Sequence, residues 1–582
     1  MSDTIDQTLW YKIRYTPLRD ALRGRLTARL DLRRPLEETA LPAEIKQVLR
    51  RVVKATRLWR LEQIEVLHEL IAHFNDGIAS GVSADELIKT FGDERQAAQL
   101  IRRAKRRNRP LPWHALRFAG WSTTALFVLY CGYAAYFFAG RPSPRVNYVA
   151  VVNQAIENTP VEDRGWTFYR RALIGADYRD SVNFSFQRLN RLATEDRRKE
   201  LTEFVSTHRA QIAWIREGAT KSRLGWVTGA KGSGNDPELW PQQSQNPIDE
   251  TGEPLSMATL PPLSGLSYLA MMLRADAIVA GQTGEGKGML QDIYSTLDLA
   301  RQAGEKGPLL LSLISMSISE MAMEDIEQAL EHPTLIKKED WLALSRRLSQ
   351  PKVAADFFSF QPDRMFFDDM LQRAFTDDGS GNGRLTPVGV AFFFSDATYP
   401  DTRTRWWERA AQPVAGLIVP SRRKLKEEYT RVIDLAEANL KLALRNADWH
   451  RAQGPRSVGA FLINQMLPSF SSSHGAAERL LGHRDGVVTG IALELYRQEH
   501  GRYPESLNAL VPEFIHEVPA DRITGAPVHY RIAAGRPLLY SVGADRKDDG
   551  GRYTLNPQQA GYWNSNAEDA PKGDWVLFPT AN

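Results

Sequence analysis

Hydrophobic and polar positions alternate with a helical period over most of this chain. Apolar residues recur three or four positions apart in five segments: residues 61–74, 266–280, 289–303, 309–330 and 424–446. This spacing is typical of helices that bury one face against a neighbour. Short turns between the segments favour antiparallel helical hairpins packed side by side. The pattern therefore predicts a mainly α-helical protein.

One stretch departs from this amphipathic pattern because it is apolar on every side. Residues 118–140 contain no charged side chain, and as a helix they would rise about 34 Å, enough to cross a hydrocarbon core of about 30 Å. Basic residues gather before the stretch: Arg102, Arg103, Lys105, Arg106, Arg107, Arg109 and Arg117. Arg141 and Arg145 follow it. The positive-inside rule predicts one transmembrane helix in the inner (cytoplasmic) membrane, with a cytoplasmic N-terminus and an exported, periplasmic C-terminal region.

The span divides the chain into four expected parts. Residues 1–117 form a cytoplasmic helical prefix, and residues 118–140 form the transmembrane helix. Residues 146–475 form an exported, mainly helical domain with long loops at 226–264 and 376–404, where Gly, Pro and polar residues accumulate. Short strands at 528–532 and 538–542 make residues 476–582 a small α+β module.

Composition and charge exclude several classes of function. The formal net charge is +4 over 582 residues, and the basic excess lies before the span, where residues 102–109 would contact anionic lipid rather than nucleic acid. The single cysteine, Cys131, lies inside the span, which excludes a thiol enzyme and a disulfide in the exported part. The segment Gly286-Lys287-Gly288 lacks the hydroxyl residue of a phosphate-binding loop, so we interpret it as a turn.

A calcium-binding loop is one interpretation of the segment that begins at Asp378. Asp378, Ser380, Asn382 and Thr386 offer oxygen atoms at positions 1, 3, 5 and 9 of this segment, which resembles the first nine positions of an EF-hand loop. Position 12 is Gly389, where the motif uses a bidentate glutamate. A polar, glycine-rich turn is the alternative interpretation.

Part of the cytoplasmic prefix resembles a known family. Within residues 61–107, a set of residues follows a recognisable order: His73, Asp76, Gly81, Glu86, Phe91, Gly92 and Asp93. This pattern resembles the HAAS or permease-prefix helical domain, which precedes membrane spans in bacterial proteins. The resemblance implies a role in interaction or signalling rather than in chemistry.

The C-terminal module carries a second resemblance. Its residues include Gly501-Arg502-Tyr503-Pro504, then Val518-Pro519, Asp521, Gly525 and Pro527, and then Ser541-Val542-Gly543-Ala544-Asp545. This order resembles the C-terminal part of the major pseudopilin of type II secretion. The resemblance implies calcium ligands among Asp545, Asp548 and Asp549, although a solvated turn is equally compatible with the residues. The chain is not expected to be a pilin, because its apolar span lies far from this module.

These observations favour a non-enzymatic scaffold or adaptor of the bacterial cell envelope, with protein partners there and a link to secretion. A transmembrane sensor, with an exported ligand-binding region and a cytoplasmic signalling head, is the first alternative. An exported hydrolase is the second. Calcium is the one cofactor that the sequence suggests.

Overall fold

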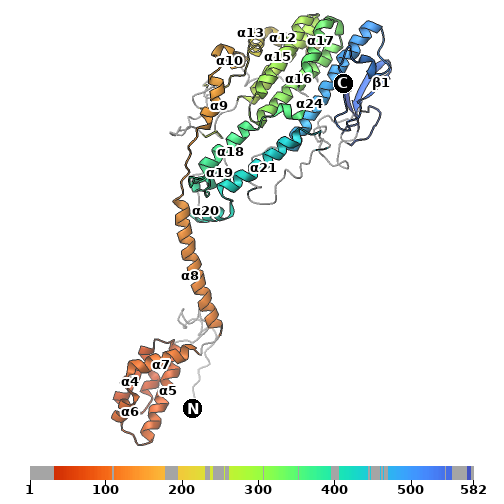
Figure 1. Cartoon of the computed structure of the whole chain (residues 1–582). Helices are drawn as coiled ribbons and strands as arrows, with labels where there is room; N and C mark the ends of the chain where they lie inside the picture. The colour runs from red at the N-terminus through yellow and green to blue at the C-terminus, as the bar shows by residue number, and fades with distance from the viewer. Residues whose placement is uncertain are drawn as a thin grey trace. The chain divides into compact units, whose positions relative to one another are not determined.

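The computed structural model is mainly helical and contains a small three-stranded sheet, as expected (Figure 1). It describes residues 32–107, 111–176, 194–229, 261–305, 307–350, 353–394, 406–443, 470–543, 545–552 and 573–578, together with residues 236, 238–239, 254–255, 446, 459 and 463. The chain divides into two compact units, Met1–Tyr133 and Ala134–Asn582.

The N-terminal unit is a helical bundle. Its helices are α3 (Arg34–Glu37), α4 (Ala43–Thr56), α5 (Arg60–Ala79), α6 (Ala84–Phe91) and α7 (Glu94–Arg107), followed by the start of α8 (Leu111–Phe138). Helix α4, which the sequence reading missed, packs against α5 and α7 and buries Ile45 and Leu49. Helix α6 is capped at its start by Ser83, whose hydroxyl accepts a hydrogen bond from the backbone N–H of Glu86.

The larger unit contains most of the helices. They are α9 (Tyr148–Glu157), α10 (Trp166–Gly175), α12 (Thr194–Thr207), α13 (Arg209–Ala219), α14 (Leu263–Thr283), α15 (Gly286–Gly304), α16 (Leu309–Leu330), α17 (Lys338–Leu348), α18 (Gln361–Ala374), α19 (Pro387–Phe394), α20 (Trp406–Ile418), α21 (Arg422–Leu440) and α24 (Phe470–His500). Short 3-10 turns are η1 (Val161–Asp163), η4 (Pro333–Leu335), η5 (Ala354–Phe357) and η7 (Leu507–Leu510).

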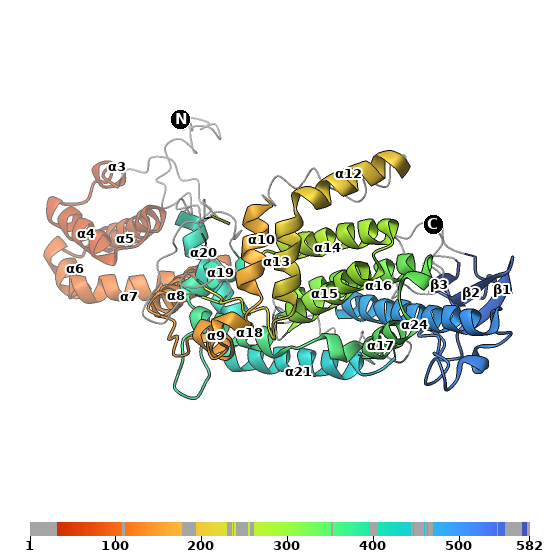
Figure 2. The same cartoon turned by 90° about the horizontal axis from the view of Figure 1, so that it is seen from above.

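The core of this unit lies among α14, α15 and α16, with α24 packed against α16 (Figures 1 and 2). Gly284 ends α14 with a left-handed φ of 78°, a conformation that glycine adopts without a Cβ penalty and that lets α15 fold back at once. The structure confirms these three helices within a few residues of their expected bounds. The helical hairpins form as the hydrophobic period predicts.

The sheet has the antiparallel order β1 (His529–Ala533), β2 (Arg536–Ser541) and β3 (Trp575–Phe578). The β1–β2 hairpin turns at Ala534 and Gly535, both with positive φ, as a two-residue turn between twisted strands requires. Strand β3, which the sequence reading missed, packs against α24. Gly486 and Gly490 of α24 leave room for Leu577 and Phe578, because a Cβ atom at either glycine would lie under 3.0 Å from them.

Two boundaries differ from those expected. The division at 475/476 falls within α24, which packs against α16 and α17 as well as against β3. The expected loop at 376–404 contains helix α19, so that prediction was wrong for residues 387–394, and residues 395–404 lie outside the described part. Most of the 226–264 loop, residues 1–31 and residues 553–572 also lie outside it.

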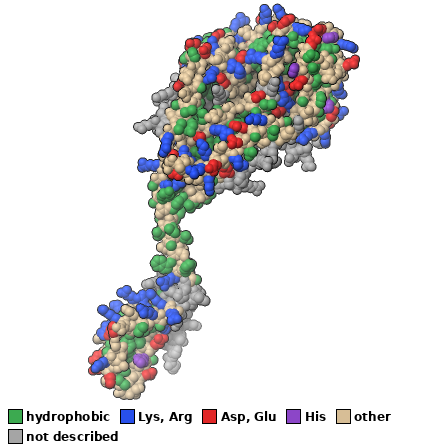
Figure 3. Space-filling model, viewed as in Figure 1, with side chains coloured by type: hydrophobic (Ala, Val, Ile, Leu, Met, Phe, Trp, Pro, Cys, Tyr) green, Lys and Arg blue, Asp and Glu red, His purple; other side chains and the backbone are tan. Residues whose placement is uncertain are grey.

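Two apolar helices have opposite surroundings. By length and composition alone, the helix in the described part of the chain that could cross a membrane is α14, not α8, and 56% of its apolar window is buried in the protein. Helix α8 overlaps the expected span at 118–140 and leaves its large apolar side chains exposed, as Leu129 does at 68%. Figure 3 shows hydrophobic side chains along the α8 stretch.

Candidate functional site

The last turn of α8 belongs to the larger unit and is held there by Arg384. The Arg384 Nη2 donates a hydrogen bond of 2.8 Å to the backbone oxygen of Tyr136. Its guanidinium carbon also lies 3.4 Å from the centre of the Tyr136 ring, within the range of a cation–π contact. The neighbouring Phe137 is fully buried. The end of α8 is therefore fastened to the loop between α18 and α19.

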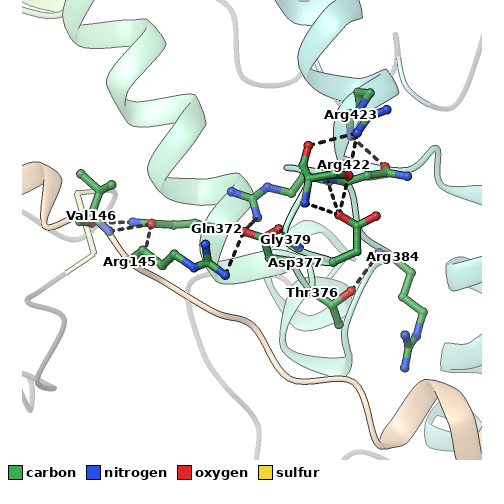
Figure 4. A network of polar contacts seen from close by, with 12 residues as sticks. Arg145, Val146, Gln372, Thr376, Asp377, Gly379, Arg384, Arg422 and Arg423 are labelled. Carbon is green, nitrogen blue, oxygen red and sulfur yellow. Dashed lines mark hydrogen bonds and ion pairs between the residues drawn. The ribbon is translucent and has the colours of Figure 1, made fainter.

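The chain that follows α8 is fastened to α18 (Figure 4). The backbone N–H groups of Arg145 and Val146 donate to Oε1 of Gln372 at 3.0 and 3.1 Å. The Gln372 Nε2 returns a bond of 2.7 Å to the Val146 carbonyl oxygen. Three hydrogen bonds from one amide side chain fix this backbone segment, because both polar atoms of the amide are used.

The loop after α18 gathers three of the four predicted EF-hand residues. The Asp378 Oδ1 accepts hydrogen bonds from the Ser380 hydroxyl at 2.8 Å, from the Ser380 N–H at 2.9 Å and from the Asn382 N–H at 3.2 Å. The Ser380 hydroxyl bond and these backbone bonds hold the pKa of Asp378 below its usual range. Asp378 is therefore a carboxylate throughout the neutral range.

Arginines from the start of α21 supply positive charge to this loop (Figure 4). The Arg423 Nη2 donates to the Ser380 hydroxyl at 2.8 Å and to the Ser380 carbonyl oxygen at 3.0 Å. The Arg422 Nη1 lies 3.2 Å from Oδ2 of Asp377. A guanidinium group thus already binds two oxygens of the loop, and a metal ion would compete with it there.

The fourth predicted ligand, Thr386, has a different role. Its hydroxyl is fully buried, donates 2.8 Å to the Ala374 carbonyl oxygen and accepts 3.1 Å from the Gly389 N–H. These bonds join the end of α18 to the start of α19. Thr386 fixes the loop's far end, whereas Asp378, Ser380 and Asn382 remain the calcium prediction.

An open groove lies beside this loop. Its volume is about 720 Å³, and it runs between the loop and the first turns of α21. Its lining combines cationic, anionic and hydroxyl side chains: Ser380, Arg423, Lys426, Thr430, Arg431 and Asp434. Leu435 also lines the groove, so a ligand there would meet both polar and apolar surface.

Asp574, which the sequence reading missed, binds the acidic loop of residues 545–551 in the C-terminal module. The Asp574 Oδ1 accepts from the Asp549 N–H at 3.1 Å, and Oδ2 accepts from the Gly551 N–H at 2.5 Å. Burial raises the pKa of Asp574, whereas the Gly550 N–H helps to hold the pKa of Asp548 below its usual range. Asp545 bonds the Lys547 N–H at 3.2 Å. Asp574 stands directly before strand β3, and because that strand was not predicted, no sequence signal pointed to Asp574.

A buried ion cluster between α16 and α24 is the second feature that the sequence reading missed. The His483 Nδ1 lies 2.9 Å from Oε1 of Glu320, and its Nε2 lies 3.2 Å from Oε1 of Glu327. The glutamates are seven residues apart and therefore share one face of α16. That spacing was visible in the sequence, but the histidine partner on α24 was not.

The cluster fits a fixed ion pair better than a catalytic base. Burial alone would lower the pKa of His483, but Glu320 and Glu327 outweigh it and raise the pKa to about 10. A general base works best with a pKa near the operating pH. His483 instead stays protonated at neutral pH, donates a hydrogen bond from Nδ1 to Glu320 and forms an ion pair with Glu327. A polar cavity of about 330 Å³ opens beside Glu320.

The basic run before α8 is partly used within the N-terminal unit. The Lys105 Nζ lies 3.3 Å from Glu65 and 3.0 Å from Glu69 on α5. Arg109 lies outside the described residues. The expected contact of residues 102–109 with anionic lipid stays a prediction.

Neither a metal-binding group nor a similar known protein indicates a function for these residues. Within the described ranges, no group of three or more His, Cys, Asp or Glu side chains is arranged to hold a metal ion. No protein-family model, curated protein sequence or solved structure matches the chain.

Proposed function

We propose that the chain is a single-pass protein of the inner membrane, with α8 as its span. The observation that carries the proposal is the exposure of apolar side chains along α8: Phe118, Trp121, Leu126, Phe127, Val128, Leu129, Tyr136 and Phe138. Contiguous exposed apolar surface of this kind marks contact with a membrane or a protein. A helix of 28 residues rises about 42 Å, which is longer than a hydrocarbon core of about 30 Å.

The proposed orientation keeps residues 1–117 in the cytoplasm and exports the larger unit. It rests on the basic residues that precede the span and on the few that follow it. A reporter that is active only outside the cytoplasm should work when fused after Asn147 and fail when fused after Arg107. A second reporter, active only inside, should give the opposite pattern. Activity of the first reporter at Arg107 alone would contradict the orientation.

We further propose a non-catalytic scaffold or adaptor role in the cell envelope. The packed hairpins of α14, α15 and α16 offer a stable framework. In the same unit, Arg384 fastens the end of α8, and Gln372 of α18 fastens the chain that follows it. The pseudopilin-like residue order of the C-terminal module suggests partners among secretion components. The adaptor would hold such partners near the membrane.

A transmembrane sensor is the second candidate, and one observation favours it. The groove lined by Arg423 and Lys426 adjoins the loop whose Arg384 holds Tyr136 of α8. A ligand in that groove could therefore act on the end of the span through directly bonded residues. An exported hydrolase is the third candidate, but His483 does not suit it as a base.

Affinity capture from solubilised membranes separates the first two candidates. The full chain should retain envelope or secretion components if it is a scaffold. A chain lacking residues 1–100 keeps the basic residues that set the proposed orientation. It should retain the same components, because the scaffold proposal assigns their binding to the exported unit. Loss of a cytoplasmic regulator from the shortened chain, with no envelope component bound to either form, would favour the sensor.

A further inference from the structure

Helices α19 and α20 expose apolar side chains that no part of the proposed function explains. We call this surface the apolar base, and its members are Val388, Phe392, Phe394, Trp406, Trp407, Val414, Leu417 and Ile418. Leu417 is 65% exposed and Val388 is 57% exposed. The two helices pack against each other, and α19 also packs against α18. Exposed patches of this size and composition mark sites of contact.

The apolar base adjoins the residues that fasten the end of α8. Val388 follows Arg384 by four residues, and four residues of chain reach at most about 14 Å. On the other side, Ile418 precedes Arg422 by four residues, and the Arg422 N–H donates to the Gly383 carbonyl oxygen at 3.0 Å. Both helices therefore start or end within a short chain length of the loop that binds Tyr136. Figures 1 and 2 agree in placing α19 and α20 near that end of α8.

The side chains of this region suit a membrane interface. Trp406, Trp407 and Tyr136 are aromatic residues of the type that gathers at the headgroup level. Arg423, which is exposed at the start of α21, adds positive charge at the edge of the same region for contact with lipid phosphates. Helices that lie on a membrane bury their apolar face about 5–10 Å into the boundary of headgroups and acyl chains.

We propose that the apolar base lies in the interfacial layer of the leaflet on the exported side of the membrane. This inference rests on the proposed span, because continuity with α8 selects lipid over a second copy or another protein as the occupant. The larger unit is then attached to the bilayer at two places, α8 and the α19–α20 pair. Two attachments restrict its tilt and hold the groove beside Arg423 close to the lipid headgroups.

The single native cysteine makes this inference testable in the full chain. Cys131 lies within α8, so a fluorescent label on it reports the span itself. In a Cys131→Ser background, Val388→Cys and Leu417→Cys report the two helices of the apolar base separately. Ile532→Cys, on the exposed side of β1, is the matched control. Each labelled protein is reconstituted into vesicles of phosphatidylethanolamine and phosphatidylglycerol with brominated acyl chains.

The expected result is strong quenching by brominated lipid at positions 131, 388 and 417, and none at 532. Bromine near the headgroup should quench positions 388 and 417 best, whereas bromine near the chain ends should quench position 131 best. Quenching at 131 without quenching at 388 and 417 would overturn the inference and leave the span intact. Absence of quenching at 131 would overturn the span and the inference with it.

A water-soluble quencher separates lipid from protein as the occupant. Labels at 388 and 417 that resist iodide but ignore brominated lipid would be covered by protein, which contradicts the inference. Labels that respond fully to iodide would be exposed to water, which contradicts it as well. Because both substitutions are at exposed positions on different helices, a folding defect in one leaves the other to decide.

Discussion

Helices α8 and α14 are both long and apolar, but they differ in how much of their apolar surface the rest of the protein covers. Helix α14 is covered by α12, α13, α15 and α16, and its Leu269 and Leu273 are fully buried. Helix α8 leaves Leu126 and Leu129 exposed. Composition selects α14 as the candidate span, whereas burial favours α8. The comparison teaches that length and hydropathy alone do not distinguish a helix buried in a protein core from a helix whose apolar side chains stay exposed.

Charge supports the same distinction. Helix α14 contains Arg274 and Asp276 near its middle, and each is paired within the larger unit. The Arg274 Nε lies 3.2 Å from Oδ1 of Asp325, and Asp276 lies 2.5 Å from Nη2 of Arg216. Helix α8 has no charge after Arg117. A buried charge needs a partner, and the protein core supplies such partners to α14.

The first prediction tests whether α8 is the helix that holds the protein in the membrane. Leu126→Arg with Leu129→Arg should cost about 5–7 kcal/mol of insertion, at about 2.5–3.5 kcal/mol for each charge near the centre of a membrane helix. The variant should become extractable from membranes by alkaline carbonate. Leu126→Ile with Leu129→Ile is the matched control and should stay in the membrane.

The converse change in α14 completes this test. Leu269→Arg should disrupt the fold of the larger unit, because it buries an unpaired charge, and the unit should become sensitive to protease. The protein should still resist carbonate extraction. If Leu269→Arg releases the protein and the α8 variant does not, the roles of the two helices are reversed.

The second prediction concerns the charge within α14. Burial raises the pKa of Asp325, which is 2% exposed, to about 7. At pH 8, Arg274→Ala therefore leaves the Asp325 carboxylate without its closest cation. Breaking a buried ion pair costs about 3–5 kcal/mol, so the melting temperature of the purified protein should fall by many degrees. Lys426→Ala removes an exposed pair with Asp368 and should cost less than about 1 kcal/mol. Equal effects of the two variants would show that the Arg274 pair lies in a more solvated place.

The period of apolar residues was sufficient to predict the helical hairpins, because α14, α15 and α16 each bury a regular stripe of side chains. The same period did not predict strand β3 or helix α19. Strand β3 is four residues long and pairs with a strand distant in sequence, so no local periodicity revealed it. The stripe of Gly482, Gly486 and Gly490 on α24 was visible, but its partner strand was not. Helix α19 was read as loop because its apolar run is short.

The candidate site residues show the same contrast between local patterns, which the sequence reveals, and contacts between distant residues, which it does not. Asp378, Ser380 and Asn382 belong to one local loop, and the structure brings them together as their spacing predicts. Gln372, Arg423 and His483 act on residues distant in sequence, and no local motif could identify their partners. Ligand identity depends on what the folded surfaces meet, and the sequence carries no direct signal for that.

The third prediction concerns His483 of α24, which pairs with Glu320 and Glu327 of α16. Helix α16 in turn packs against α14. Its folded pKa of about 10 exceeds the unfolded value of about 6.5. The ion pair therefore stabilises the fold fully below pH 6.5, and this stabilisation is lost as the pH rises toward 10. Between pH 6.5 and 9 the loss should reach about 3 kcal/mol. Melting curves recorded across this range should show a falling transition temperature.

Two histidine variants separate this effect from general alkaline destabilisation. His483→Gln should be less stable at pH 6.5 and should show a flatter dependence on pH. His516→Gln changes an exposed histidine and should follow the parent protein. If His483→Gln keeps the full pH dependence, other groups cause it and the His483 pKa is not raised in the fold.

The smallest expected effect concerns calcium at the two acidic loops. Asp378, Ser380 and Asn382 form one candidate, and Asp545, Asp548 and Asp549 form the other. The first lacks the glutamate at position 12, and Arg423 already binds two of its oxygens. Binding should therefore be weak, with a Kd of about 10⁻⁴–10⁻³ M, as in extracellular modules.

A ligand that binds only the folded state at ten times its Kd stabilises that state by about 1.4 kcal/mol. The purified protein should therefore melt measurably higher in millimolar calcium than in chelator. Asp378→Ala and Asp545→Ala should each remove part of the shift, whereas Arg423→Ala should enlarge the part that depends on Asp378, because it removes a competing cation. If melting curves with calcium and with chelator coincide, or if magnesium gives the same shift, both loops are solvated turns.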